Sequence, residues 1–135
     1  MPPPSFSVDR SRWPVVVYQM DGVADRETTR LYLEAVDENL RRIEAEDGRY
    51  VAIVVADSLR TNASHRKAIA RELEERRDRI QRRCAGNALV TTSTTARGLL
   101  TALRWITDLP VPVEVFPTLE EAHAWADLVR SGRRP

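Results

Sequence analysis

Four consecutive residues near the middle of the chain bring together a hydroxyl, an imidazole and two cations: Ser64, His65, Arg66 and Lys67. A polar segment before them adds carboxylate, hydroxyl and amide groups at Asp57, Ser58, Thr61 and Asn62. We expect a helix to begin at Ser64 or Asn62. The unpaired N–H groups and dipole of a helix start attract anions. Two interpretations stay open: Ser64 caps the helix, or this segment is a phosphorylation site or an anion or partner contact.

A second hydroxyl-rich segment, Ser93-Thr94-Thr95, precedes Arg97. A guanidinium pairs well with a phosphate or a carboxylate, so Arg97 is a candidate contact for an anion or for Asp57. The segment lacks the glycine spacing of a P-loop, and helix capping is the competing interpretation.

Catalytic groups are scarce. The only histidines are His65 and His123, and the only cysteine, Cys84, falls on an apolar helical stripe that indicates a buried thiol. The motifs of zinc proteases and serine hydrolases are absent from the sequence. We therefore assign no catalytic residue, metal ligand or cofactor, and we expect the protein not to be an enzyme.

The bulk composition is typical of one globular domain. The chain has 135 residues, 42% of them hydrophobic and 30% charged, with a formal net charge of +1. This charge balance weighs against nucleic acid as a partner. A single cysteine, no signal peptide and no apolar run of membrane-spanning length predict a cytoplasmic protein without a membrane partner.

The elements that must position these residues follow from the apolar patterning. Two strands, Phe6–Val8 and Trp13–Met20, are expected to form a hairpin, and apolar runs predict later strands at Tyr50–Ala56, Ala88–Thr92 and Val113–Phe116. Helical spacing predicts helices at Asp25–Glu46, from about Ser64 to Ala85 with Gly86 as its stop, at Thr94–Thr107, and after a capping box at Thr118. The order ββαβαβαβα predicts an α/β fold with a mixed, mostly parallel sheet. We place a disordered proline-rich leader at 1–5, the domain at 6–130 and a basic tail at 131–135.

The first two predicted helices carry opposite charge. Asp25–Asp47 holds eight acids and four arginines, a net of −4, whereas Arg66–Arg83 holds eight basic residues and four acids, a net of +4. Two interpretations of these charges stay open. Either they lie on solvated helix faces, or the first helix of one copy contacts the second helix of another in a homo-oligomer.

The chain resembles the SpoIIAA-like branch of the STAS-type proteins, also called STAS/SEC14-like in bacteria. The resemblance rests on 8–14 (VDRSRWP), 64–67 (SHRK), 97–105 (RGLLTALRW), and Phe116-Pro117-Thr118 with Ala122 and Trp125. It implies a STAS-like single domain and a non-enzymatic, regulatory role through a protein partner of unknown identity. Anti-sigma-factor antagonists of this kind bind a kinase-like partner and are switched by phosphorylation of a serine that opens the second helix.

This chain departs from that pattern, because Asn62-Ala63-Ser64-His65 replaces the Asp-Ser-Ser-Gly-Leu run. The SEC14-like label implies an alternative role as a small-molecule or lipid-binding protein. A homo-oligomeric scaffold component is the other alternative.

Overall fold

The computed structural model describes residues 5–56, 59–60, 63–94 and 111–132. Within these residues the elements are, in chain order, β1 (Ser5–Arg12), β2 (Val15–Val23), α1 (Arg26–Glu46), β3 (Tyr50–Val55), β4 (Leu59–Arg60), α2 (Ala63–Glu75), α3 (Arg77–Arg83), β5 (Cys84–Val90), β6 (Val113–Phe116) and α5 (Leu119–Arg130). The main sheet has the strand order β1-β2-β3-β5-β6, and the short β4 pairs with β2. Among the described strands only the β1–β2 pair is antiparallel, so the predicted α/β fold with a mixed, mostly parallel sheet is confirmed.

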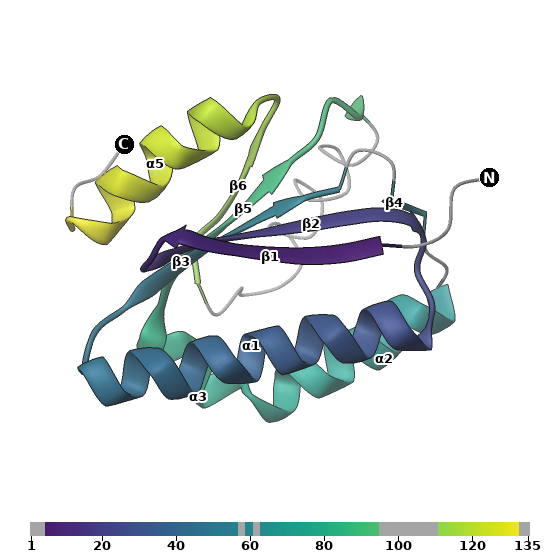
Figure 1. The fold of residues 1–135 in the computed structure, drawn as a ribbon, viewed down its shortest axis with the longest axis horizontal. Coiled ribbons are helices and arrows are strands. Elements are labelled where there is room, and N and C mark those ends of the chain that lie inside the picture. Colours follow the sequence, from purple (N-terminus) through teal and green to yellow (C-terminus); the bar gives the residue numbers. More distant parts are fainter. Residues whose placement is uncertain (1–4, 57–58, 61–62, 95–110, 133–135) are drawn as a thin grey trace.

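Helices cover both faces of the sheet. Figure 1 shows α1, α2 and α3 along one face and α5 on the other. Each face has its own core. The first is built by Val16 and Tyr18 of β2 against the buried stripe of α1, and the second by Val51 and Ile53 of β3 against α5.

The ends of α1 are as predicted. The Asp25 carboxylate accepts from the Thr28 backbone N–H at 2.8 Å, and the Thr28 hydroxyl accepts from the Asp25 N–H at 2.9 Å, which completes a capping box. The helix stops at Asp47, which adopts a left-handed φ of 53°. The Gly48 N–H then bonds the Ile43 carbonyl at 3.1 Å.

The second predicted helix was wrong in its extent and in its stop. It ends at Glu75, Arg76 leaves helical geometry with φ −101° and ψ 5°, and α3 continues only to Arg83. Gly86 is therefore no helix stop, because β5 already begins at Cys84. A Cβ on Gly86 would lie 2.7 Å from the Trp125 ring, so glycine is needed there for the close approach of α5.

The last helix follows its prediction closely. The Thr118 hydroxyl accepts from the Glu121 N–H at 3.2 Å, and Ala122, Trp125 and Ala126 are buried against the sheet. The helix predicted at Thr94–Thr107 lies outside the described residues except for Thr94.

A polar network joins the hairpin to α1. Asn39 is fully buried on α1; its amide donates to the Tyr18 hydroxyl and accepts from Arg10 Nε at 2.8 Å. Burial raises the pKa of Tyr18, so this phenol stays neutral and serves as a hydrogen-bonding group. The network explains how a polar residue is accommodated among the apolar residues of the stripe.

Candidate functional site

The start of α2 lies beside the start of α1, at the end of the sheet where β2 and β3 finish. Ser64, Arg66 and Lys67 are exposed there, and His65 is half-buried. Because α2 begins at Ala63, Ser64 is its second residue rather than its N-cap. The other site residues of the sequence analysis lie outside the described residues: Asp57, Ser58, Thr61, Asn62 and Arg97.

His65 connects the two helix starts. Its Nε2 lies 3.0 Å from the Asp25 carbonyl oxygen and also contacts the Thr29 hydroxyl. A carbonyl can only accept, so Nε2 carries the proton. Since the Thr29 hydroxyl itself donates to the same carbonyl at 2.9 Å, one backbone oxygen receives donors from both helices. His65 therefore fixes the start of α2 against the N-cap of α1.

An apolar pocket of about 230 Å³ opens next to this contact. The residues that line it come from β2, the loop after it, α1, β3 and α2: Met20, Ala24, Thr28, Thr29, Tyr32, Val54, Arg66 and Ile69. The Thr28 and Thr29 hydroxyls are already bonded to Asp25, so the pocket presents mainly carbon to its contents. Exposed Arg66 makes its outer margin basic, and the next residue of α2, Lys67, is exposed as well.

The sequence predicted the basic residue at the margin of this pocket, Arg66, but not the apolar residues that line it. Met20 ends the predicted strand Trp13–Met20, Tyr32 lies within the predicted helix Asp25–Glu46, and neither is among the site residues predicted from the sequence. The signal that could have indicated this apolar lining is Tyr32, an aromatic residue directly before Leu33 in the predicted helix.

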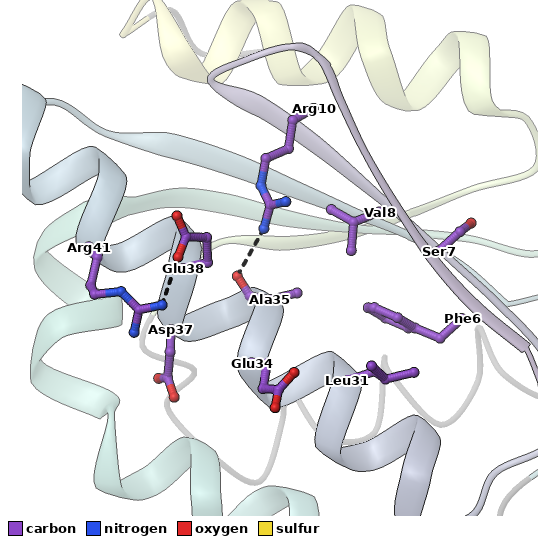
Figure 2. Close-up of a pocket in the computed structure, with 10 residues that line it drawn as sticks. All are labelled: Phe6, Ser7, Val8, Arg10, Leu31, Glu34, Ala35, Asp37, Glu38 and Arg41. Atoms are coloured by element: carbon purple, nitrogen blue, oxygen red, sulfur yellow. Dashed lines mark hydrogen bonds and ion pairs between the residues drawn. The ribbon is translucent and has the colours of Figure 1, made fainter.

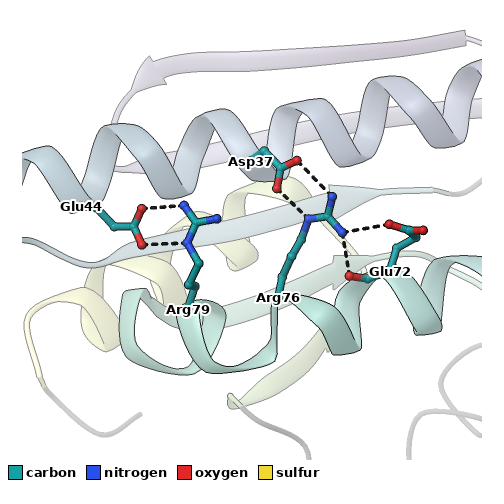
Figure 3. Close-up of polar contacts among 5 residues, drawn as sticks. All are labelled: Asp37, Glu44, Glu72, Arg76 and Arg79. Atoms are coloured by element: carbon teal, nitrogen blue, oxygen red, sulfur yellow. Dashed lines mark hydrogen bonds and ion pairs between the residues drawn. The ribbon is translucent and has the colours of Figure 1, made fainter.

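The opposite charges of the helices are paired within one chain (Figure 3). Arg76 binds the Asp37 carboxylate through Nε at 2.6 Å and Nη2 at 3.0 Å, and it also donates to the Glu72 carbonyl at 2.7 Å. Arg79 binds Glu44 in the same two-pronged way, at 2.9 and 2.6 Å. These bonds lower the pKa of Asp37 and of Glu44 below their ordinary values.

The pairs change the interpretation of the charge pattern. The acidic α1 meets the basic α3 of its own chain, and Arg83 with Asp47, 3.0 Å apart, adds a third contact. The complementarity that suggested homo-oligomerisation through these helices is thus used inside the chain.

A wider groove of about 630 Å³ runs between β1 and α1 (Figure 2). Phe6, Val8 and Leu31 contribute its apolar surface. Its charged groups have partners: Arg41 binds Glu38 at 2.7 Å, and Arg10 turns inward to Asn39 and, at 3.5 Å, to the Ala35 carbonyl. The groove therefore reflects how β1 is attached to α1, and its charges are not directed at a ligand.

Other chemistry has little support in the described part of the chain. No three His, Cys, Asp or Glu side chains among these residues are grouped to hold a metal ion. Cys84 is buried, and this burial raises the pKa of its thiol to about 11, which keeps it in the poorly nucleophilic protonated form. His123 is half-buried on α5 and has a lowered pKa, chiefly from burial. None of the helices described is both long and apolar enough to span a membrane.

The arrangement of the sheet and helices matches solved structures over nearly the whole chain. An uncharacterised protein of the DUF3478 family from Shewanella loihica, with a SpoIIAA-like fold, superposes with a TM-score of 0.65 at 13% identity, covering 91% of this chain and 93% of the other. The chain has a SpoIIAA-like fold. An anti-sigma factor antagonist from Mycobacterium paratuberculosis superposes with a TM-score of 0.52 at 16% identity, over 93% and 95% of the two chains. No family model matches the sequence. No curated protein sequence matches it either.

Proposed function

We propose that this chain is a non-enzymatic, protein-binding regulatory module that contacts its partner with the surface where α1 and α2 begin. The apolar pocket between the two helix starts carries the proposal. A volume of about 230 Å³ suits one large apolar side chain, and such a side chain in a pocket is a typical binding anchor. The SpoIIAA-like fold, which the chain shares with an anti-sigma factor antagonist, supports the same role.

The charge around the pocket indicates what kind of partner fits. Arg66 is exposed at its margin and Lys67 is exposed next to Arg66 in the chain, so the partner would place acidic residues around its apolar anchor. The contact between His65 and Asp25 keeps the two walls of the pocket together before binding. A preformed pocket lowers the ordering cost of association.

Ser64 supplies a means of regulation in this proposal. Ser64 is exposed in the first turn of α2, two residues before Arg66 of the pocket lining. A phosphate there would be favoured by the helix start and would cancel the positive charge of Arg66 and Lys67. An acidic partner would then be repelled. Phosphopeptide mapping of the protein from its own cells tests this step, and an unmodified Ser64 under all growth conditions would contradict it.

Site-specific crosslinking tests the binding surface. A photo-crosslinking residue at Lys67 is expected to capture a discrete partner in the native cells, whereas the same residue at Asp127, exposed on α5 across the sheet, is not. The purified partner should then bind Ile69→Asp about tenfold more weakly or worse, because a charge enters the apolar pocket. Ala68→Asp is the matched control, since Ala68 is exposed on the same helix. Equal crosslinking at both positions, or an unaffected Ile69→Asp, would reject this surface.

A further inference from the structure

A second cavity, of about 320 Å³, lies between the sheet and the helices α2 and α3. Tyr50, Ala52 and Asn87 contribute from the sheet, and Leu73 and Ile80 from the helices. None of the residues of α2 is buried, so the apolar side of this helix faces the cavity without closing it. The volume falls at the lower end of the range for small-molecule sites, about 300–1,000 Å³.

Asn87 is the unexplained group in this cavity. The strand pairing aligns Asn87 of β5 with Ala52 of β3 and Val16 of β2, all on the sheet face that carries the cavity. Its backbone N–H bonds the Pro112 carbonyl at 2.8 Å. Its side-chain Oδ1 is buried and accepts no hydrogen bond from the described residues. Buried acceptors are nearly always satisfied, so an orphan of this kind calls for a donor that the described residues do not supply.

Apart from one ion pair at the solvent side, the rest of the cavity wall is neutral. Burial raises the pKa of Tyr18 and Tyr50 and that of the Cys84 thiol, so these groups stay protonated at neutral pH. The lining charges are Glu74 and Arg77, which pair with each other at 3.3 Å and are 67% and 38% exposed. They mark the side of the cavity that faces solvent. A charged ligand would lose its hydration inside without gaining a counter-ion.

We propose that this cavity binds a small, neutral, mainly apolar molecule whose hydroxyl or N–H group donates a hydrogen bond to Oδ1 of Asn87. Tyrosine rings and aliphatic side chains supply the apolar contacts, and the amide supplies orientation. This site is separate from the pocket at the helix starts and does not depend on the protein-binding role, although Tyr32 lines both.

Two probes that differ only in the donor test the proposal: p-cresol and its methyl ether. Titration of the full chain, followed by the NMR signals of the Asn87 side-chain amide, should show saturable binding of p-cresol. One neutral hydrogen bond predicts that p-cresol binds about three- to tenfold more tightly than the ether. In Asn87→Leu, which keeps a similar volume, the two affinities followed by backbone signals should become equal.

A second variant keeps the test decisive if Asn87→Leu alters the fold. Ala52→Leu fills the space next to Asn87 and should abolish binding of both probes while the amide remains. The proposal is overturned if p-cresol fails to bind the wild-type protein, or if both probes bind it equally. It is also overturned if the preference for p-cresol survives in Asn87→Leu, or if Ala52→Leu binds like the wild type.

Discussion

His65 of α2 donates from Nε2 to the backbone carbonyl of Asp25, the N-cap residue of α1, at 3.0 Å. Two helix starts that are forty residues apart in the chain are thus held together by one imidazole. Arg66 and Lys67, the next two residues, are exposed. Within this short segment, one residue therefore holds the site together while its neighbours are available to a partner.

Replacing His65 should loosen α2 without unfolding the domain. In His65→Ala, hydrogen exchange of the amides in the first two turns of α2 is expected to accelerate, because the contact with α1 is lost. Exchange in β3 and β5 should stay unchanged. Lys67→Ala serves as the control, and equal acceleration in both variants would mean that the His65 contact does not anchor the helix.

Arg76 should contribute more to stability than the exposed arginines. Arg76→Ala is expected to lower the free energy of unfolding by roughly 1–2 kcal/mol, because a two-pronged pair and a bond to the Glu72 carbonyl are lost together. Arg76→Lys should recover little of this, since an ammonium cannot reproduce the planar fork. Arg41→Ala, which removes an exposed pair on α1, should change the value by less than about 0.5 kcal/mol. Urea denaturation measures the free energy of unfolding of all three variants against the wild type.

The paired carboxylates predict acid sensitivity. The pKa values of Asp37 and Glu44 are lowered in the folded state, each chiefly by a hydrogen bond from its arginine. The unfolded chain therefore takes up protons first, so the stability from these pairs is complete above the ordinary values of 3.8 and 4.5 and declines as pH falls through the lowered ones. Asp37→Asn with Glu44→Gln should be less stable than the wild type at pH 7, and the difference should shrink in acid. A pH-independent difference in urea midpoint would contradict the linkage.

Gly86 should tolerate no side chain while Trp125 is present. In Gly86→Ala the new Cβ would lie 2.7 Å from the ring, and we expect a loss of about 1–3 kcal/mol from the displacement of α5. Trp125→Leu alone should also destabilise the domain. The double variant should lose less than the sum of the two, and strict additivity in the thermodynamic cycle would argue against the contact.

Asn87→Leu should stabilise the ligand-free protein, by about 1 kcal/mol or more, because a buried acceptor without a partner is removed. Asn87→Asp should do the opposite, since it buries a charge. Thermal unfolding of the wild type, Asn87→Leu and Asn87→Asp measures their order of stability. A destabilised Asn87→Leu would indicate that the amide is satisfied in solution.

The parts of the fold that follow from local rules were predictable. Asp25 with Thr28 and Thr118 with Glu121 have the spacing of helix caps, and both helices begin there. The break at Arg76 was not predictable, because arginine favours helix and the carboxylate that Arg76 binds, Asp37, is distant in sequence. The prediction of Gly86 as a helix stop was wrong for a related reason, since the role of this glycine is set by Trp125 rather than by the preceding helix.

Some features of the candidate site were likewise predictable from local sequence, whereas others depend on contacts between distant residues. The cluster from Ser64 to Lys67 was visible as a polar helix start, and the structure exposes most of it. The function of His65 as a link between helices depends on Asp25, so no local pattern reveals it. Asn87 had a signal that was overlooked: it is the only polar side chain other than the cysteine in the Cys84–Val90 strand.

Asn39 has a consequence for how uniquely the sequence specifies its structure. Its side-chain amide is hydrogen-bonded to Arg10 of β1 and to Tyr18 of β2. A single residue of α1 therefore fixes the position of the helix relative to both strands of the hairpin. An apolar stripe alone would permit the helix to rotate or slide by one turn at small cost, because leucine and valine contacts are interchangeable. Any such shift would leave the Asn39 amide without partners in an apolar interior. Asn39 therefore makes one packing position of α1 on the sheet more stable than packings that are rotated or shifted by one turn.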